Sequence, residues 1–379
     1  MKEILFRLYL TAMKTVGLFV KIKPRVAILN EAGRSGSNGY LFYKWLKENH
    51  PEIEARMIEP WPSSHLPLKT WRYLASCQWL LATHQPFKMK RKQILIEFWH
   101  GVPLKRMGTM AHNTKYADNH RNQVLWQKDV DAVTSSSDLY ETLMSSCMGI
   151  ASTKYRKVGF PRLDFLKKPA ISKAELLTDL FGVTSGKVGI YMPTFRYELE
   201  DQAVLSQIEN GNFLTMPDFN LTELEKALAE NDEYLVVKLH PYEMRLLAKQ
   251  TVNSQRIAFI NQDYLDQKDL DLYEILGNFD FLMTDFSSIY FDYLTLDRPI
   301  IFISNYQTQY QKTRGFLMAY EQVTPGEKVH TQAELCQALR FETDYRASRQ
   351  RLRELTMQVE DSCPRVYQLM RQLCEKNIH

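Results

Sequence analysis

The chain has 379 residues, of which 45% are hydrophobic and 24% are charged, a balance typical of globular proteins. This length is too great for one ordinary core, so we expect two domains. The net charge of +4 is too small to indicate nucleic acid as a partner. The five cysteines are scattered without a Cys-x-x-Cys pair, which argues against a zinc site and against a disulfide framework. No apolar run reaches the roughly 18 residues of a membrane span.

The first 23 residues have the periodicity of an amphipathic helix. One side of this helix is apolar and carries Ile4, Leu5, Leu8, Ala12, Val16 and Phe19. The opposite side carries Arg7, Lys14 and Lys21. Such a segment either lies in the interface of an anionic membrane or docks on its own domain, and we expect membrane association. Lys14 interrupts the apolar stretch and no cleavage site follows, which argues against a signal peptide.

Short apolar runs then alternate with helical patterns in two successive series. The predicted strands are Arg25–Leu29, Ala55–Ile58, Trp79–Thr83, Ile94–Trp99, Ala132–Thr134, Lys157–Val158, Lys187–Met192, Tyr234–Leu239, Ile257–Phe259, Phe281–Thr284 and Pro299–Ile303. Strands that alternate with helices predict parallel sheets. We therefore expect an α/β protein with two Rossmann-like domains, 24–166 and 167–379, that face each other across a cleft. The last helices either stay with the second domain or cross back to the first.

Two predicted strands end in a histidine. His100 and Gly101 follow the strand 94–99, with Lys105 shortly after them. His240 follows the strand 234–239, and Lys238 precedes it by two residues. Because ligands bind at the carboxyl ends of parallel strands, both histidines are candidates for chemistry. Each alone is more often an ordinary core or surface histidine.

Two further strand ends carry polar residues that suit an anionic ligand. Thr194 and Arg196 follow the strand 187–192, and an arginine at this place can hold a phosphate with two N–H groups. At the end of the strand 281–284, residues that suit a helix cap also offer the hydroxyls of a phosphate cradle. The polar residues of this segment are Thr284, Asp285, Ser287 and Ser288.

Arg162 and Asp164 follow the turn Gly159-Phe160-Pro161. They either line a hinge between the domains or serve the turn itself.

Together these residues favour a phosphate-bearing donor that reacts without a bound metal or cofactor. The chain has no Walker loop, no Gly-x-Gly-x-x-Gly fingerprint and no paired carboxylates of the kind that a two-metal site needs. One histidine can act as general base on an acceptor hydroxyl. The other, with the arginine and the helix start, can hold negative charge while a phosphate is transferred.

Six segments in this order resemble the CDP-glycerol glycerophosphotransferase family, the teichoic acid primases and polymerases of Gram-positive cell walls. They cover the chain from about Ile94 to Val329 and read FWHGVPLKRMG, VGFPRLDFL, YMPTFR, VVKLHPYE, MTDFSSIYFDYLTLDRPIIF and RGFLMAYEQVTPGE. Phe195 and Phe286 stand where many members have Trp and Tyr, and Val102 stands where many have Thr.

The resemblance implies a GT-B fold and peripheral attachment to the cytoplasmic face of the cell membrane. It implies transfer of glycerol phosphate or ribitol phosphate from CDP-glycerol or CDP-ribitol, with release of CMP. The implied acceptor is a saccharide carried on undecaprenyl diphosphate, and the product belongs to teichoic acid or a related polymer. Chain length favours a primase or a short-chain transferase over a long-chain polymerase.

The resemblance also implies roles for individual residues. His100 matches the general base, and His240 matches a histidine that stabilises the transferring phosphate. Arg196, Ser287 and Ser288 match positions around the donor pyrophosphate, and Thr284 and Asp285 share their loop.

Two other functions stay open from the sequence. A nucleotide-sugar glycosyltransferase of the same fold would transfer a sugar instead of a polyol phosphate. A non-catalytic scaffold at the membrane surface would bind the donor without releasing CMP.

Overall fold

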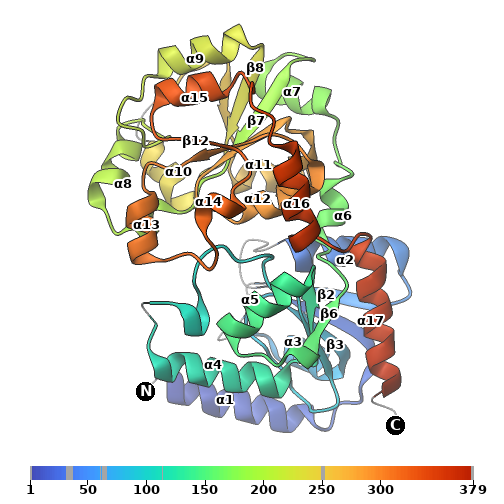
Figure 1. Ribbon diagram of the computed structural model, residues 1–379. Helices are drawn as coiled ribbons and strands as arrows, with labels where there is room; N and C mark the ends of the chain where they lie inside the picture. The colour runs from blue at the N-terminus through green and yellow to red at the C-terminus, as the bar shows by residue number, and fades with distance from the viewer. Residues whose placement is uncertain are drawn as a thin grey trace. The chain divides into compact units, whose positions relative to one another are not determined.

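The computed structural model describes residues 2–30, 37–59, 61, 66–112, 114–248 and 252–376 (Figure 1). The chain forms two compact units. The first comprises Met1–Gly101, Lys115–Asp164 and Gln358–His379. The second comprises Val102–Thr114 and Phe165–Met357, so the chain crosses between the units several times.

The first unit is built on a parallel sheet of six described strands in the order β2-β1-β3-β4-β5-β6. In chain order the strands are β1 (Lys23–Leu29), β2 (Glu54–Ile58), β3 (Cys77–Ala82), β4 (Ile94–Glu97), β5 (Ala132–Ser135) and β6 (Tyr155–Lys157). Its helices are α1 (Lys2–Gly17), α2 (Asn38–Asn49), α3 (Leu68–Ser76), α4 (Tyr116–Asp129), α5 (Asp138–Met148) and α17 (Ser362–Lys376). The strand order reverses between β1 and β3, where a parallel sheet opens a crevice at its carboxyl edge.

The second unit repeats this plan with the strand order β12-β11-β10-β7-β8-β9, again all parallel. The strands are β7 (Lys187–Tyr191), β8 (Glu233–Val237), β9 (Ile257–Phe259), β10 (Phe281–Thr284), β11 (Ile300–Ile303) and β12 (Glu327–Val329). Its helices are α7 (Lys173–Phe181), α8 (Gln202–Glu209), α9 (Leu221–Glu230), α10 (Pro241–Leu247), α11 (Gln262–Gln267), α12 (Ile289–Tyr293), α13 (Gln307–Thr313), α14 (Tyr320–Val323), α15 (Gln332–Ala338) and α16 (Arg346–Thr356). The short α6 (Arg162–Leu166) spans the boundary between the units. The order reverses between β7 and β10.

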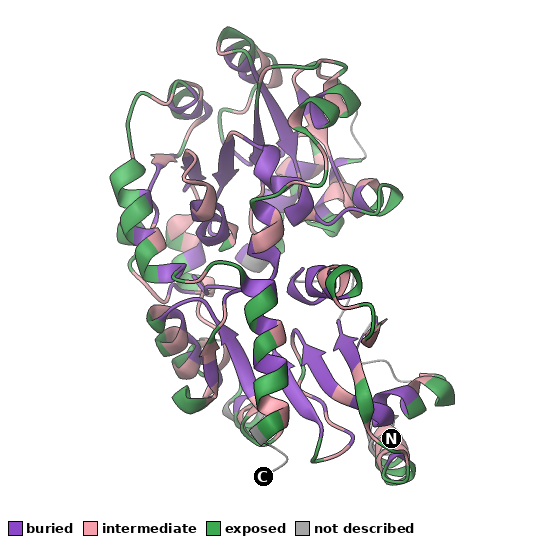
Figure 2. Cartoon of the chain, turned by 90° about the vertical axis from the view of Figure 1, so that its right-hand side faces the viewer, coloured by how far each residue is buried: buried purple, intermediate pink, exposed green. Residues whose placement is uncertain are grey.

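Burial follows the layers of each unit, as Figure 2 shows: the strands are buried, and the helices expose one side. Strands such as β4, β8 and β11 are buried along their whole length. Strands covered on both faces read as continuous apolar runs, which is why the sequence pattern predicts them. Strand β12 escapes that prediction, since its sequence Glu-Lys-Val places two charged residues in a strand of three.

The last helix, α17, belongs to the first unit. Its first turn is capped by Asp164, whose carboxylate accepts the backbone N–H groups of Ser362 and Cys363 at 2.9 and 2.7 Å. The indole Nε1 of Trp79 on β3 donates to the carbonyl of Met370 at 2.9 Å. The sequence leaves open whether the last helices stay with the second domain or cross back to the first. In the structure α17 packs on the sheet of the first unit.

The N-terminal helix α1 docks through the side that lacks the apolar stripe. The Tyr9 hydroxyl accepts a hydrogen bond of 2.8 Å from the indole of Trp71 on α3, and the Lys14 ammonium lies 4.9 Å from the centre of the Phe87 ring. Gly17 is buried, and a Cβ at this position would lie 2.8 Å from Cε of Met89, whose side chain would have to shift.

The opposite side of α1 and the turn after it are exposed. The exposed apolar residues are Leu5, Leu8, Val16, Leu18 and Phe19. Ile4 and Arg7, which the sequence places on the two sides of this helix, have side chains outside the described part of the structure. No helix among the described residues is long and apolar enough to cross a membrane.

Candidate functional site

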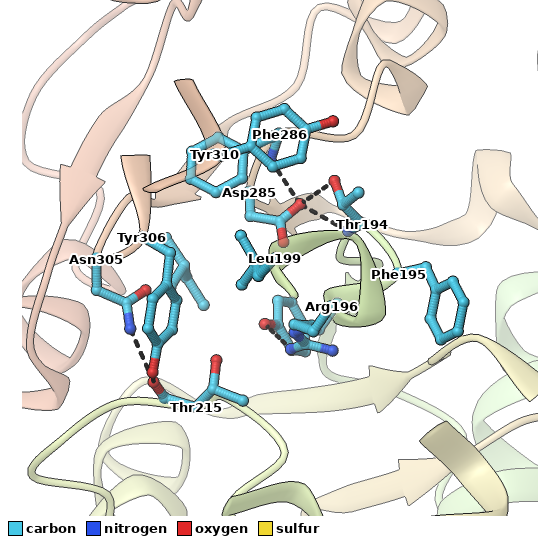
Figure 3. Close-up of a pocket in the computed structure, with 12 residues that line it drawn as sticks. Thr194, Phe195, Arg196, Leu199, Thr215, Asp285, Phe286, Asn305, Tyr306 and Tyr310 are labelled. Atoms are coloured by element: carbon cyan, nitrogen blue, oxygen red, sulfur yellow. Dashed lines mark hydrogen bonds between the residues drawn. The ribbon is translucent and has the colours of Figure 1, made fainter. Parts of the chain in front are cut away.

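A small pocket lies at the carboxyl edge of the second sheet, where the strand order reverses between β7 and β10 (Figure 3). Its walls come from the segments that follow β7, β10 and β11. They include Thr194, Phe195, Arg196, Thr215, Asp285, Phe286, Asn305 and Tyr306. This is the place where an open parallel sheet takes a nucleotide or another ligand. The pocket contains three of the residues that the sequence predicts to bind the donor: Thr194, Arg196 and Asp285.

Asp285 ties the two central loops of this pocket together. One carboxylate oxygen accepts the backbone N–H of Thr194 at 2.6 Å and its hydroxyl at 2.7 Å. The same oxygen accepts the N–H groups of Phe286 at 2.5 Å and Ser287 at 3.2 Å. Burial raises the pKa of Asp285, while Arg196 and these hydrogen bonds oppose the rise. The carboxylate therefore takes two of the loop N–H groups that the sequence assigns to a phosphate.

The hydroxyl groups of the same loop differ in what they contact. Thr284 is fully buried and donates to the carbonyl of Met192 at 2.7 Å, which joins β10 to the end of β7. Ser287 is half-buried. Ser288 is exposed at the start of α12, and its side chain makes no capping hydrogen bond. The two serines are therefore the hydroxyls of this loop that solvent reaches.

Arg196 lies under the pocket with its guanidinium group engaged by the protein. Its N–H groups contact the carboxylate of Glu243 at 3.2 Å, the hydroxyl of Tyr191 at 2.6 Å and the carbonyl of Phe213 at 2.8 Å. The exposed fractions of the Arg196 and Glu243 side chains are 3% and 0%. The Arg196 backbone N–H also donates to Glu243, at 2.7 Å. Contact of this arginine with a donor phosphate stays a prediction.

His240 caps the start of α10 and is exposed. Its Nδ1 accepts the backbone N–H of Tyr242 at 3.3 Å, so in the neutral ring the proton sits on Nε2. The ring stacks on Phe195, with centroids 3.9 Å apart and planes 22° apart. Lys238, two residues earlier, is partly buried, and burial lowers the pKa of its ammonium group against the opposing charge of Asp271. The second unit thus holds the ring of His240 by a hydrogen bond to Nδ1 and by stacking on Phe195.

In the first unit, the turn that carries His100 has unusual backbone angles. Trp99 has φ of 52° and Gly101 has φ of 103°. The second value suits only glycine, and the first is costly for a bulky residue. The Trp99 N–H donates to the buried carboxyl of Glu97 at 3.1 Å, and the Trp99 carbonyl accepts from the Asn38 amide at 3.2 Å. Hydrogen bonds on both sides of Trp99 therefore hold the turn in this form.

Arg162 supports the same turn. Its guanidinium group donates to the carbonyl of His100, and its backbone N–H donates to the Asn38 side chain at 3.2 Å. The structure therefore brings Arg162 and His100 together, whereas Asp164 points to the first turn of α17. Binding of substrate by Arg162 and Asp164 stays a prediction.

The segment after Gly101 is part of the second unit. Lys105 forms an isolated antiparallel bridge with Phe316, and the Arg106 N–H donates to the carbonyl of Gly315 at 3.0 Å. Lys105 is therefore held by a backbone pairing near the aromatic cluster of Phe286 and Phe316, whose ring centroids are 5.8 Å apart.

Two residues of these sites are missing from the sequence prediction. His84 directly follows the predicted strand 79–83, and its ring contacts that of His100 with centroids 3.9 Å apart. The rule that singles out His100 and His240, a histidine after a strand, also finds His84. Glu243 has no such signal, because a glutamate in a first helical turn normally faces solvent.

Among the residues that the structure describes, no group of three or more His, Cys, Asp and Glu side chains could hold a metal ion.

Comparison with known proteins bears on what this site does. The profile of the family described as CDP-Glycerol:Poly(glycerophosphate) glycerophosphotransferase matches residues 43–371. The chain belongs to this family. The predicted family and enzyme class are therefore confirmed.

Two relatives in teichoic acid synthesis illustrate the similarity. A teichoic acid poly(glycerol phosphate) polymerase of Bacillus spizizenii is 23% identical over 372 residues, which cover 91% of this chain and 90% of that protein. The teichoic acid ribitol-phosphate polymerase TarL of Staphylococcus aureus is 27% identical over 263 residues, which cover 66% of this chain and 42% of that protein.

The solved structure of the wall teichoic acid polymerase TagF matches this chain with a TM-score of 0.74 and 18% identity, covering 100% of this chain and 97% of that one. At this identity the match concerns the fold, and it confirms the GT-B-like α/β class that the sequence predicts.

The burial of Glu97 predicts that the stability of the protein depends on pH. Burial raises the pKa of this carboxyl to about 8, against 4.5 as its ordinary value, with the Trp99 N–H opposing the rise. The neutral form is therefore favoured by folding. Its contribution to stability is complete below about pH 4.5 and is lost as the pH rises through about 8. Glu97→Gln removes the titration and keeps an acceptor for Trp99. We expect the melting temperature of the wild type, relative to Glu97→Gln, to fall over this range, and a constant difference would contradict the prediction.

The buried pair predicts a large effect of Glu243→Gln on stability. The substitution keeps the shape of the side chain but leaves the Arg196 cation buried without its counter-charge. We expect the free energy of unfolding to fall by about 3–5 kcal/mol, measured by denaturant titration. The control is Glu230→Gln in the exposed pair with Lys226, whose side chains are 59% and 76% exposed. That change should stay within about 1 kcal/mol. Equal effects of the two substitutions would contradict the role given to the buried pair.

Proposed function

We propose that this protein transfers glycerol phosphate or ribitol phosphate from the corresponding CDP-polyol to a hydroxyl of a saccharide carried on undecaprenyl diphosphate. The proposal places the reaction in the synthesis of teichoic acid or a related cell-surface polymer. It is supported by family membership and by one structural observation. Each parallel sheet carries at its carboxyl edge a histidine whose turn is fixed by the protein's own hydrogen bonds.

In the proposed reaction His100 is the general base. It takes the proton of the acceptor hydroxyl as the oxygen attacks the polyol-bearing phosphorus of the donor. The bond from this phosphorus to the bridging oxygen breaks, and CMP leaves with that oxygen. The proton passes from His100 to solvent, so the base is regenerated.

In the proposed reaction, His240 stabilises the negative charge that develops on the transferring phosphate. The hydrogen bond from Tyr242 leaves the proton on Nε2, and an N–H donor is what a phosphate oxygen requires. Stacking on Phe195 fixes the plane of the ring. Around the donor pyrophosphate we propose Thr194, Ser287 and Ser288.

The remaining assignments follow the sequence prediction. They assign substrate contact to Gly101, Lys105, Arg162, Asp164, Arg196, Lys238, Thr284 and Asp285. Several of these side chains, among them Arg162, Arg196 and Asp285, form hydrogen bonds within the protein. We propose that such residues contribute mainly by holding the loops around the substrate in place.

The first test is release of CMP by the purified protein with a short-chain lipid-linked disaccharide as acceptor. CDP-glycerol and CDP-ribitol are supplied separately, and a set of UDP-sugars tests the alternative of a glycosyltransferase. We expect CMP from one CDP-polyol. His100→Ala and His240→Ala should each lower turnover about a hundredfold or more. His330→Ala, an exposed histidine elsewhere in the second unit, is the control and should stay near wild type. Transfer of a sugar, or near-normal turnover of either variant, would overturn the proposal.

We further propose that α1 attaches the protein to the cytoplasmic face of the membrane. The exposed fractions of Leu5, Leu8 and Phe19 are 61%, 63% and 88%. An apolar stripe of this kind fits the interface of a bilayer, and the exposed Lys21 adds attraction to anionic lipids.

The paired substitution Leu8→Glu and Val16→Glu tests this attachment. Both residues are exposed, so the fold should be retained, whereas deletion of the helix would uncover Trp71. We expect co-sedimentation with phosphatidylglycerol vesicles to fall roughly tenfold or more, because apolar burial is lost and charges of the wrong sign are added. The control is Leu355→Glu at an exposed position of α16. Unchanged binding of the α1 variant would remove the proposal.

A further inference from the structure

The reversal of strand order in the first sheet lies between β1 and β3, and it carries polar residues that the proposed function does not use. Asn30 follows β1, and Thr83 and His84 follow β3. Asn30 and Thr83 are fully buried, with the Thr83 hydroxyl 3.5 Å from the Asn30 amide oxygen. Strand β4, which leads to His100, is the next neighbour of β3. The switch point of the sheet, where ligands of parallel sheets bind, therefore lies one strand away from the candidate base.

His84 is in direct ring contact with His100. The two centroids lie 3.9 Å apart with the planes at 65°, an edge-to-face arrangement. Trp99 closes the group, with its ring 6.2 Å from His84 and 5.3 Å from His100. Edge-to-face pairs have a preferred geometry and resist rotation of either ring. The Thr83 hydroxyl lies 3.1 Å from Nδ1 of His84 and holds that ring in turn.

The charge state of His84 suits this place. Burial lowers its pKa to about 4, so the ring is uncharged near neutral pH. The buried Glu97 carboxyl, with a pKa of about 8, is mainly neutral in the same range, and the Arg162 cation is bonded to the His100 carbonyl. A neutral aromatic ring stabilises an adjacent imidazolium, whereas a second cation would oppose its formation.

We propose that His84 is a positioning residue for His100: it holds the imidazole of the base in one orientation and gives it an uncharged aromatic neighbour while it carries the proton. The inference rests on the proposed function, in which His100 is the general base. The substrate itself contacts His100, and His84 acts through that ring.

The test is a double-mutant cycle on CMP release, with kcat and the KM for the CDP-polyol measured separately. We expect His84→Ala to lower kcat about tenfold or more, because a misplaced base loses its alignment, and to leave the KM for the donor unchanged. His84→Phe keeps an aromatic ring of similar size and should return kcat to within about threefold of wild type. In a His100→Ala background, His84→Ala should have no further effect, since two residues that act as one unit are not additive.

The matched control is His50→Ala in the same unit. His50 also packs face to ring, on Tyr367 at 3.7 Å between centroids, but it follows α2 and takes no part in the proposed site. It should leave kcat unchanged. Melting temperatures of the His84 variants show whether the fold is kept, and His84→Phe carries the test if His84→Ala is unstable.

The outcomes separate the two proposals. If His100→Ala turns over normally, the base assignment fails and this inference falls with it. If His100→Ala is impaired but His84→Ala is not, or if the two effects multiply, the role of His84 alone is overturned. The same holds if folded His84→Phe is as slow as His84→Ala. Loss of kcat at constant KM, rescue by Phe and non-additivity together support it.

Discussion

The buried ion pair between Arg196 and Glu243 is the contact on which the candidate donor site depends. Arg196 follows β7, and Glu243 lies in the first turn of α10 after β8, so the pair joins the ends of two neighbouring strands. Because both side chains are almost fully buried, removal of either charge leaves the other without its hydrogen-bonded partner. Tyr191 and Phe213 occupy further N–H groups of the guanidinium. The helix that His240 caps is thereby fixed to the loop that lines the pocket.

Other polar residues at the strand ends also form hydrogen bonds within the protein, which hold the loops of the candidate site in place. Asp285 gathers the N–H groups of its own loop and the start of the Thr194 loop, and Arg162 holds the carbonyl of His100. A site built in this way is preorganised, since the groups that surround the ligand cannot relax when it arrives. In the proposed function, recognition of the donor is assigned to polar groups that reach solvent, among them the exposed Ser288 and His240.

The sequence predicts the strands and helices well, but it does not predict which side chains form hydrogen bonds with one another, for a physical reason. Alternating apolar runs and helical periods depend on neighbours along the chain, so eleven of the strands can be placed before the structure is seen. Partners depend on tertiary contacts: Arg196 meets Glu243 47 residues later, and Asp164 meets Ser362 198 residues later. Helix α1 shows the same limit. Its apolar stripe is visible in the sequence, but docking uses Tyr9, whose role depends on Trp71 in another helix.

The turn of His100 shows why such tertiary contacts matter for catalysis. A bulky residue with positive φ, as at Trp99, costs of order 1–3 kcal/mol and persists only when its surroundings hold it. The hydrogen bonds of Glu97, Asn38 and Arg162 do so, and all of them come from the first unit. From Val102 onward the chain belongs to the second unit. The strained turn thus ends at this boundary, and the hydrogen bonds that hold Trp99 and the His100 carbonyl come from the unit whose sheet leads to the proposed base.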